Sequence, residues 1–294
     1  MFGIVLAASG GVLLSFADAG KKSLTKVFSP ELLILLMFTF GIVVNFFYLS
    51  LQELPPIDWT AVWLPALVCG LLAAVGEMLF LYGLRGADLS IAMPLMASLP
   101  LFSSLLGYIL FGEVPTMLGG FGALTIVLGA YLLNIKRPLR ENAFLPITRI
   151  VSDKACMFIL IAVFIGAIIF VGQRYGVRHS SPVTFFTMTL VVDWFVFLGL
   201  VVWNKSFRMS EEASLSLILT LCGTGLAWAV GLTLLYASYN YTLAVYAGSA
   251  LPVQTLLGIT LGAFFFGEER YFQRMIAGVV IVAGVLMISW AANA

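Results

Sequence analysis

Residues 101–113 read LFSSLLGYILFGE, and residues 256–268, 155 positions further on, read LLGITLGAFFFGE. Six positions carry the same residue type in both segments, and each segment ends in Phe-Gly-Glu. The same register continues into the next apolar run, where Ile126, Val127 and Gly129 recur as Ile281, Val282 and Gly284. A repeat of about half the chain length indicates one internal duplication, not a solenoid of short repeats.

The composition identifies the class of protein. The chain has 294 residues, of which 62% are hydrophobic and only 10% are charged. Soluble domains carry roughly 25% charged residues, so this chain lacks the polar groups to cover a water-exposed globule. The formal net charge of +1 gives no sign of nucleic-acid binding. We therefore expect an integral, multi-pass protein of the cell (inner or plasma) membrane.

Ten apolar runs approach the roughly 20 residues that a membrane-spanning helix needs. They are 2–20, 31–51, 62–84, 89–111, 116–134, 155–173, 183–203, 215–237, 243–266 and 273–291. The longest polar connection, Asn134 to Lys154, divides them five and five. Because five is odd, the second copy enters the membrane in the opposite sense, which predicts an all-α membrane protein of two inverted five-helix repeats, 1–140 and 141–294.

Lysine and arginine are distributed unequally between the two sides of this predicted bundle. Thirteen of the 15 lie on the side of the Asn134–Lys154 linker, and only Arg174 and Arg178 lie on the other. The positive-inside rule then favours a cytoplasmic linker with both termini outside.

Further duplicated landmarks follow a fixed order. Each half has a Ser-Pro pair that opens an apolar run eight residues after a cation, an aromatic near the end of its third run, and Gly-Glu at the end of its fourth. In the first half they are Lys22 with Ser29-Pro30, then Leu81-Tyr82 and 112–113. In the second half they are Arg174 with Ser181-Pro182, then Leu235-Tyr236 and 267–268. In this order the sequence resembles the EamA-type ten-helix carriers of the drug/metabolite transporter superfamily across nearly the whole chain.

The resemblance implies a secondary transporter that moves a small polar metabolite by alternating access. Export of an amino acid or a related compound is the leading expectation, and drug-like cations or sugar-type solutes are the alternative. The expected partners are a small-molecule substrate, protons and the lipid bilayer, with no nucleic acid and no cofactor, in a monomer or homodimer. We expect no enzymatic role. An intramembrane enzyme or scaffold is the alternative of another class.

The sequence departs from those carriers at several points, among them a proline and the expected orientation. Pro100 stands twelve residues before Gly112, as in relatives, whereas the second copy has Thr255 there and Pro252 three residues earlier. Relatives are also usually drawn with cytoplasmic termini, opposite to the charge count here. Both absolute orientations therefore stay open.

Charged residues inside hydrocarbon are costly, so each is a candidate for function. Asp193, beside Trp194, lies in the middle of its run and either faces the central cavity, binding a cation, an amino group or a proton, or makes a structural hydrogen bond while protonated. Glu77 either lines the same cavity or pairs with Arg85. Asp18 stands four residues before Lys22, the spacing of a local ion pair.

The duplicated charges stand at helix ends. Glu113 and Glu268 either fix a helix end, by bonding to nearby backbone or to Arg270, or act as a gate. Lys22 and Arg174 are either interfacial anchors whose charged ends reach the headgroups or ligands of the substrate, and they join the same group of helix-end and gate candidates.

Prolines inside the fourth and ninth runs, Pro94, Pro100 and Pro252, remove backbone donors and are typical of a hinge or of a packing kink. In the hinge interpretation they expose carbonyl groups to a solute. Gln254, Ser103 and Ser104 are then the nearby polar ligands.

Four aromatic residues are candidate walls of a cation pocket: Tyr82, Tyr236, Tyr239 and Trp228. Interfacial belts suit Tyr236 and Tyr239 better, whereas Trp228 is mid-span and is the better pocket candidate. Gly122 and Gly129 recur as Ala277 and Gly284, a spacing that permits close helix packing within the monomer or between two copies.

Other chemistry finds no support in the sequence. Cys69, Cys156 and Cys222 have no paired spacing and read as apolar fillers. His179 is the only histidine, which leaves no pair to ligate zinc, and Gly20-Lys21-Lys22-Ser23 lacks the earlier glycine of a phosphate loop.

Overall fold

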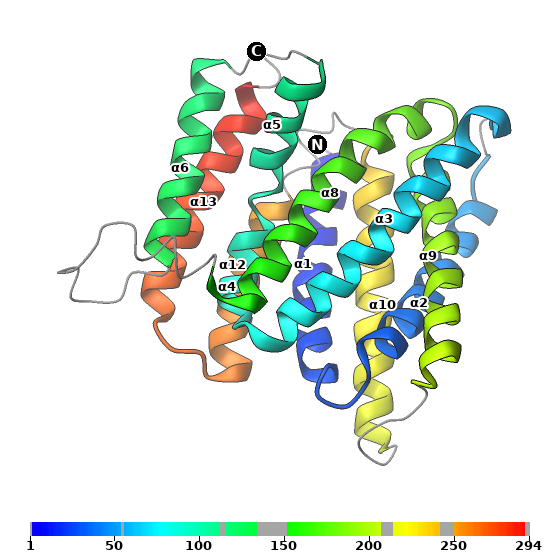
Figure 1. Ribbon diagram of the computed structural model, residues 1–294, viewed down its shortest axis with the longest axis horizontal. Helices are drawn as coiled ribbons and strands as arrows, with labels where there is room; N and C mark the ends of the chain where they lie inside the picture. The colour runs from blue at the N-terminus through cyan, green and yellow to red at the C-terminus, as the bar shows by residue number, and fades with distance from the viewer. Residues whose placement is uncertain are drawn as a thin grey trace.

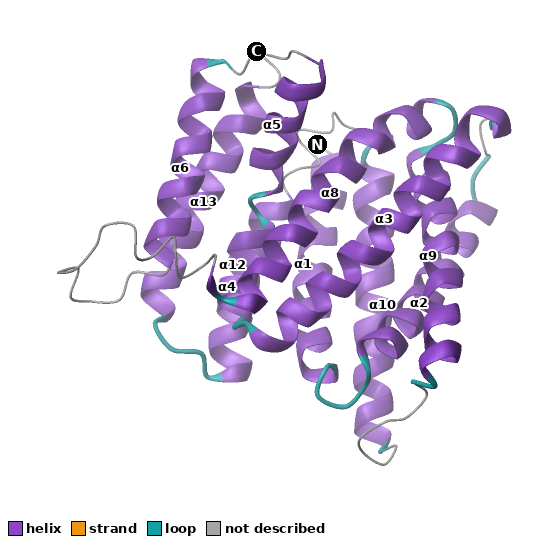
Figure 2. Ribbon diagram, in the orientation of Figure 1, coloured by secondary structure: helices purple, strands orange, loops and turns teal. Residues whose placement is uncertain are grey.

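The computed structural model describes residues 2–53, 56–111, 116–133, 152–206, 214–241 and 250–291. Every regular element in these ranges is an α-helix (Figures 1 and 2). In chain order they are α1 (Phe2–Leu24), α2 (Pro30–Ser50), α3 (Trp59–Gly86), α4 (Leu89–Met96), α5 (Leu99–Phe111), α6 (Met117–Leu133), α8 (Lys154–Arg178), α9 (Pro182–Asn204), α10 (Leu215–Ser238), α12 (Ala250–Phe266) and α13 (Tyr271–Ala291).

The helices have the length and composition of membrane spans. Within the described ranges, six are long and apolar enough to cross a bilayer, namely α2, α3, α8, α9, α10 and α13. Shorter apolar segments lie at Leu89–Ser103, Met117–Ala130 and Val253–Phe266. The all-α membrane fold expected from the sequence is confirmed.

One expected span is two helices. The run 89–111 is divided between α4 and α5, with Ala97 and Ser98 between them. Pro94 lies inside α4, and Pro100 is the second residue of α5, a position where a missing backbone N–H costs little. The Ser98 hydroxyl donates to the Leu95 carbonyl at 2.6 Å and so satisfies one acceptor at the break. The two prolines therefore flank a real interruption in the helix.

The two halves pack by the same rules. Helix α1 packs on α10 as its counterpart α8 packs on α3, and α10 contacts α2 as α3 contacts α9. Counterparts run in opposite directions: α1 descends from the N-terminus whereas α8 ascends, and α6 descends beside the rising α13 (Figure 1). The inverted arrangement thus follows from the packing, while the expected boundary at residue 140 lies outside the described residues.

Two seams between the halves depend on glycine. A Cβ atom on Gly284 would lie 2.6 Å from the Gly122 carbonyl oxygen, and one on Gly122 would lie 2.8 Å from the Gly284 oxygen. In the seam of α1 and α10, a Cβ atom on Gly10 would lie 2.7 Å from the Gly231 oxygen. The small residues of α6 and α13 therefore serve packing within one chain, which was one of the two alternatives that the sequence left open.

The Ser-Pro landmarks are helix starts. The Ser29 hydroxyl accepts a hydrogen bond from Leu32 N at 3.3 Å, and the Ser181 hydroxyl accepts one from Thr184 N at 3.2 Å. Each proline then occupies the first position of its helix, where its fixed φ suits the turn. The duplicated motif therefore sets the start of α2 and α9, which contact each other.

Candidate functional site

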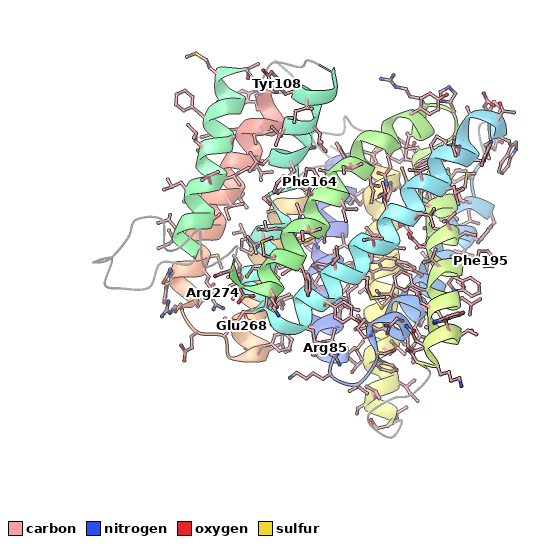
Figure 3. All side chains as sticks on the ribbon, in the orientation of Figure 1. Arg85, Tyr108, Phe164, Phe195, Glu268 and Arg274 are labelled. Carbon is pink, nitrogen blue, oxygen red and sulfur yellow. The ribbon has the colours of Figure 1, made fainter. Side chains whose placement is uncertain are left out.

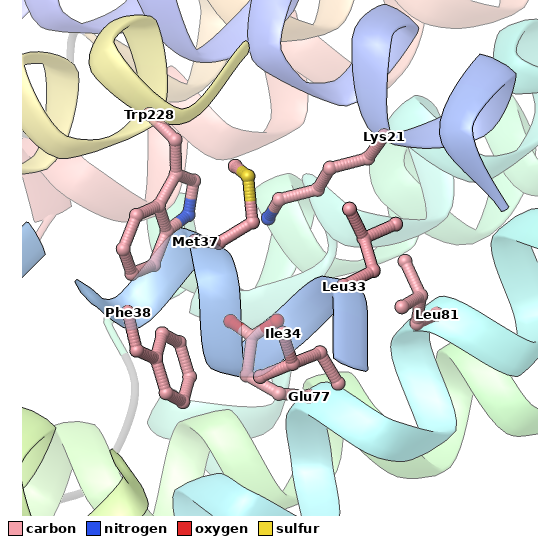
Figure 4. Close-up of a pocket in the computed structure, with 8 residues that line it drawn as sticks. All are labelled: Lys21, Leu33, Ile34, Met37, Phe38, Glu77, Leu81 and Trp228. Atoms are coloured by element: carbon pink, nitrogen blue, oxygen red, sulfur yellow. The ribbon is translucent and has the colours of Figure 1, made fainter. Parts of the chain in front are cut away.

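A crevice with about 220 Å³ of empty space lies among α1, α2, α3 and α10 (Figure 4). It is lined by Lys21, Leu33, Ile34, Met37, Phe38, Glu77, Leu81 and Trp228. Three of these helices come from the first half and α10 comes from the second. Most of the lining is apolar, with one charge of each sign.

Helical spacing explains why α2 supplies half of this lining. Leu33, Ile34, Met37 and Phe38 recur at intervals of three and four residues, which places them on one face. The same face continues through Gly41, where an added Cβ atom would lie 2.8 Å from Leu190 and 2.9 Å from Trp228. The glycine therefore lets the Trp228 ring approach the α2 backbone beside the crevice.

Aromatic rings form one end of the crevice. The Phe38 and Trp228 rings stack with centroids 5.3 Å apart at 29°. The Lys21 ammonium lies 5.2 Å from the Trp228 ring centroid and 5.6 Å from that of Phe80. Such distances are typical of cation–π attraction.

A hydrogen-bonded chain joins α1 to α12 beside the crevice. Gln254 Nε2 donates to Asp18 Oδ2 at 2.7 Å, and the Ser15 hydroxyl donates to the Gln254 carbonyl at 2.9 Å. Asp18 Oδ1 lies 3.9 Å from Lys21 Nζ. The expected pair of Asp18 with Lys22 is wrong, because the Lys22 ammonium pairs with Glu268 at 3.1 Å and Lys21 is the cation near Asp18.

Two carboxyl groups approach each other between α3 and α9. Asp193 on α9 is 4% exposed, lies beside the Ala74 backbone and is within electrostatic range of Glu77. Its Oδ1 atom has no hydrogen-bond partner in the part of the chain that is described. Glu77 lines the crevice, and Arg85, its alternative partner, is exposed at the end of α3 with no ion pair to Glu77 among the described residues.

A second polar cluster closes one end of the bundle. Glu268, 4% exposed, pairs with Lys22 at 3.1 Å and with Arg274 at 3.3 Å. It also accepts hydrogen bonds from Leu89 N at 2.6 Å and from Ser90 N at 2.9 Å. Glu268 and Arg274 lie at the same end of the bundle as Arg85 (Figure 3).

This cluster replaces an ordinary helix cap. Asp88 stands at the N-cap position of α4 but makes no capping bond, and its carboxylate pairs with Arg274 at 2.6 Å. Glu268 takes over the cap, where a negative charge also suits the helix dipole. Lys22 donates to the Ala87 carbonyl at 2.6 Å, which ties α1 to the same point. We call Lys22, Asp88, Ser90, Glu268 and Arg274 the ionic cluster.

The ionic cluster differs from its duplicated position. At the 155-residue offset, Glu268 corresponds to Glu113, but Arg274 corresponds to Gly119 and Asp88 to Leu243. Glu113 lies outside the described residues, as does the side chain of Arg174. The sequence alone therefore shows that the Asp88–Arg274 bridge has no counterpart in the other copy.

Comparisons with known proteins now place the fold. The model of the EamA-like transporter family matches residues 1–135 and 153–290, one match for each half. The chain belongs to the EamA-like transporter family. The resemblance seen in the sequence is thereby confirmed.

One distant relative and one solved structure are also similar to this chain. An uncharacterized transporter from Methanothermobacter thermautotrophicus is 24% identical over 235 residues. That match spans 79% of this chain and 65% of the relative, a little under two thirds of its length. A protein of known crystal structure has a TM-score of 0.63 and 17% identity, covering 99% of this chain and 97% of its own, which concerns the fold alone.

Not every candidate residue of this EamA-like chain lies at the crevice. Tyr82 is 40% exposed on α3 and packs against Phe158, because its position on the helix faces away from α2. Trp194 donates to the Thr39 hydroxyl at 3.0 Å instead of lining the crevice. Tyr236 lies inside the bundle instead of in an interfacial belt: it stacks on Phe186 and accepts a hydrogen bond from Gln173 at 3.1 Å. Tyr239 packs edge-on against Tyr236.

The break between α4 and α5 brings fewer ligands than the sequence suggested. Ser103 lies on α5, beyond the crevice lining, and the side chain of Ser104 is not described. Pro252 stands in the first turn of α12, so the described part of that helix has no internal proline kink. Of the predicted polar ligands, Gln254 comes nearest to the crevice, through Asp18.

Sequence reasoning missed Lys21 as a site residue and missed the partners of Glu268. The spacing of Asp18 and Lys21, three residues apart, places both on one helix face and was a usable signal. Ser90 and Arg274 carried no local signal, since they meet Glu268 only when α4, α12 and α13 pack together.

Proposed function

We propose that this EamA-like protein is a secondary carrier of the cell membrane that moves a small polar metabolite by alternating access. The observation that carries the proposal is the crevice: it has charges of both signs, and helices of both halves form it. Most of its roughly 220 Å³ is narrow space between side chains or is open to the outside, so the crevice has room for little more than one water molecule. A carrier closed around such a crevice has to open before a solute enters.

The two units 1–140 and 141–294 are the proposed moving bodies. Asp18–Gln254 and the ionic cluster both join α1 or α4 of the first unit to α12 or α13 of the second. We assign the ionic cluster, with Glu113 and Arg174 at the duplicated position, as gates at the two mouths. The charge count favours a cytoplasmic position for the ionic cluster.

Export of an amino acid or a related compound, the expectation from the resemblance, fits a crevice that offers both an ammonium and a carboxylate. Drug-like cations are the second candidate, favoured by Glu77 beside the Trp228 and Phe38 rings. We assign proton binding to Asp193, because a buried carboxylate with an unpaired oxygen is stable only when it carries a proton or faces a cation.

The test begins with the purified full-length chain in detergent. A thermal-shift screen against amino acids, amines, sugars and nucleosides identifies a stabilising class, and that solute is then used in proteoliposomes. A carrier shows saturable uptake and counterflow, in which unlabelled solute inside accelerates uptake of labelled solute. Unsaturable flux without counterflow identifies a channel, and product formation in detergent identifies an intramembrane enzyme; either result contradicts the proposal.

A further inference from the structure

Two neighbouring lysines on α1 have opposite surroundings. Lys22 donates to the Ala87 carbonyl at 2.6 Å and pairs with Glu268 at 3.1 Å. The Lys21 side chain is 7% exposed, yet its closest carboxylate oxygen, Asp18 Oδ1, lies at 3.9 Å. That distance exceeds hydrogen-bond reach, so the Lys21 ammonium makes no hydrogen bond within the described residues.

An ammonium group carries three N–H donors and no acceptor. Two aromatic faces and one carboxylate at 3.9 Å attract the charge of Lys21 but leave these donors without acceptors on the protein. Asp18 does not move closer, because Gln254 of α12 holds its other oxygen at 2.7 Å. Lys21 is therefore a buried donor that points into the crevice and is suited to an anionic group of a ligand.

Glu77 presents the opposite charge to the same crevice. It makes no hydrogen bond or ion pair in the described part of the chain, and no ion pair joins it to Lys21. Figure 4 shows both charged ends directed toward the middle of the lining side chains, with Met37, Phe38 and Trp228 beside them. The crevice thus offers an anion receptor, a cation receptor and an apolar wall within one small volume.

The position equivalent to Lys21 in the other half carries no charge. In the register set by Lys22 and Arg174, position 21 corresponds to Gln173. Gln173 is neutral, and its amide donates to the Tyr236 hydroxyl at 3.1 Å. The positive charge of Lys21 therefore has no equivalent at Gln173. This indicates that the packing of the duplicated fold does not require a charge at this position.

We propose that the crevice binds a zwitterionic solute, with its carboxylate on Lys21, its ammonium on Glu77 and its apolar part against Phe38 and Trp228. This assignment rests on the proposed function and adds the receptor for each charged end. A solute with both ends satisfies two buried groups at once, whereas a simple amine or acid satisfies one and leaves the other unpaired.

Matched probes separate these three kinds of solute. Alanine, leucine and phenylalanine are the zwitterions, each compared with its decarboxylated amine and its deaminated acid. Binding of each probe to the purified full-length chain in detergent is measured by thermal shift over a concentration series. In the wild type we expect at least one zwitterion to bind about tenfold or more tightly than its amine and its acid.

Two substitutions test which residue binds the carboxylate and which binds the ammonium of the solute. Lys21→Gln introduces the residue of the duplicated copy, and we expect the preference of the zwitterion over its amine to disappear while the amine still binds. Glu77→Gln removes the other receptor, and we expect the preference over the acid to disappear instead. Lys26→Gln, a change of charge at an exposed lysine at the end of α1, keeps both preferences.

The outcomes separate this proposal from the transport assignment. It is overturned if no zwitterion binds more tightly than its amine, or if Lys21→Gln retains the wild-type preference at an unchanged melting temperature. Counterflow in proteoliposomes decides the carrier assignment independently. A chain that exchanges a cation or a sugar with Lys21→Gln unaffected remains a carrier, and only the role of Lys21 falls.

Discussion

At the scale of single residues, the membrane interior makes each buried charge depend on its partners. Glu268 has five contacts to Lys22, Arg274, Leu89 N, Ser90 N and the Ser90 hydroxyl, so it is held firmly in one place. Asp193 has an oxygen with no partner among the described residues. Two acidic residues of similar burial thus differ in their contacts, and this difference supports the proposed assignment of proton binding to Asp193 and not to Glu268.

Asp193→Asn tests the proton role. Asparagine has nearly the same shape but cannot take up or release a proton, so we expect the pH dependence of solute uptake into proteoliposomes to flatten. The measurement is the initial rate across a pH series. Asp58→Asn is the matched control, because Asp58 is an exposed N-cap of α3 and asparagine caps helices equally well. Unchanged rate and pH dependence in Asp193→Asn contradict the assignment.

Glu268→Gln tests the ionic cluster. The substitution leaves Lys22 without its carboxylate partner in a mostly buried place, so we expect a loss of about 3 kcal/mol in the free energy of unfolding. The midpoint of denaturation in detergent measures this change. Glu269→Gln alters the adjacent, exposed residue and is expected to change stability by less than about 0.5 kcal/mol. Equal effects of the two variants contradict the role given to the cluster.

At the scale of helices, the sequence predicted most elements but not all of their interruptions. Apolar runs and Ser-Pro pairs place the helix starts because hydrophobic length and capping are local properties. The division of the run 89–111 into α4 and α5 could not be predicted with certainty. Its prolines indicated that a break was possible, but a proline permits a break without requiring one. The neighbours of Tyr82 and Trp194 were not predictable, because which face of an apolar helix points inward depends on its partners.

The seam of α6 and α13 gives a prediction for one helix pair. In Gly284→Ala the new methyl group would lie 2.6 Å from the Gly122 carbonyl oxygen, so the backbones have to separate. We expect a loss of about 1–3 kcal/mol in the free energy of unfolding, measured by denaturation in detergent.

Gly120→Ala provides the control for that seam, because a Cβ atom there meets nothing within 4 Å. Alanine is better than glycine inside a helix by roughly 0.5–1 kcal/mol, so this variant is expected to be slightly more stable. A seam that tolerates Gly284→Ala as well as this control would show that the close approach of α6 and α13 contributes little to stability.

At the scale of the whole molecule, duplication made the architecture predictable. The 155-residue repeat and an odd number of spans per half imply inverted copies, and the packing of α1 on α10 and α8 on α3 agrees. The site was less predictable: Glu77, Trp228 and Gln254 follow from charge or position in a span. Lys21 and the partners of Glu268 depend on contacts between distant segments.

Labelling tests the inverted copies. Lys26 and Arg178 are exposed at equivalent turns, 152 residues apart. In a background without Cys69, Cys156 and Cys222, we expect Lys26→Cys and Arg178→Cys to react with an impermeant maleimide from opposite faces, and Lys26→Cys from the cytoplasmic face. Reaction of both cysteines from the same face would rule out the inversion, whereas an exchange of the two faces would reverse only the orientation.

In the proposed carrier, the Asp88–Arg274 bridge favours closure of one mouth, whereas the 155-residue offset places Leu243 and Gly119 at the equivalent positions of the other copy. A solute that arrives at the bridged mouth meets an entrance that is open for a smaller fraction of the time. The half-saturation concentration for entry from that face should therefore exceed that from the opposite face, as rates in oriented vesicles would show. Equilibrium is untouched, since no arrangement of fixed charges drives net flow between equal concentrations. The bridge therefore affects the solute concentration needed for half-maximal entry from each side, and not the direction of net flow.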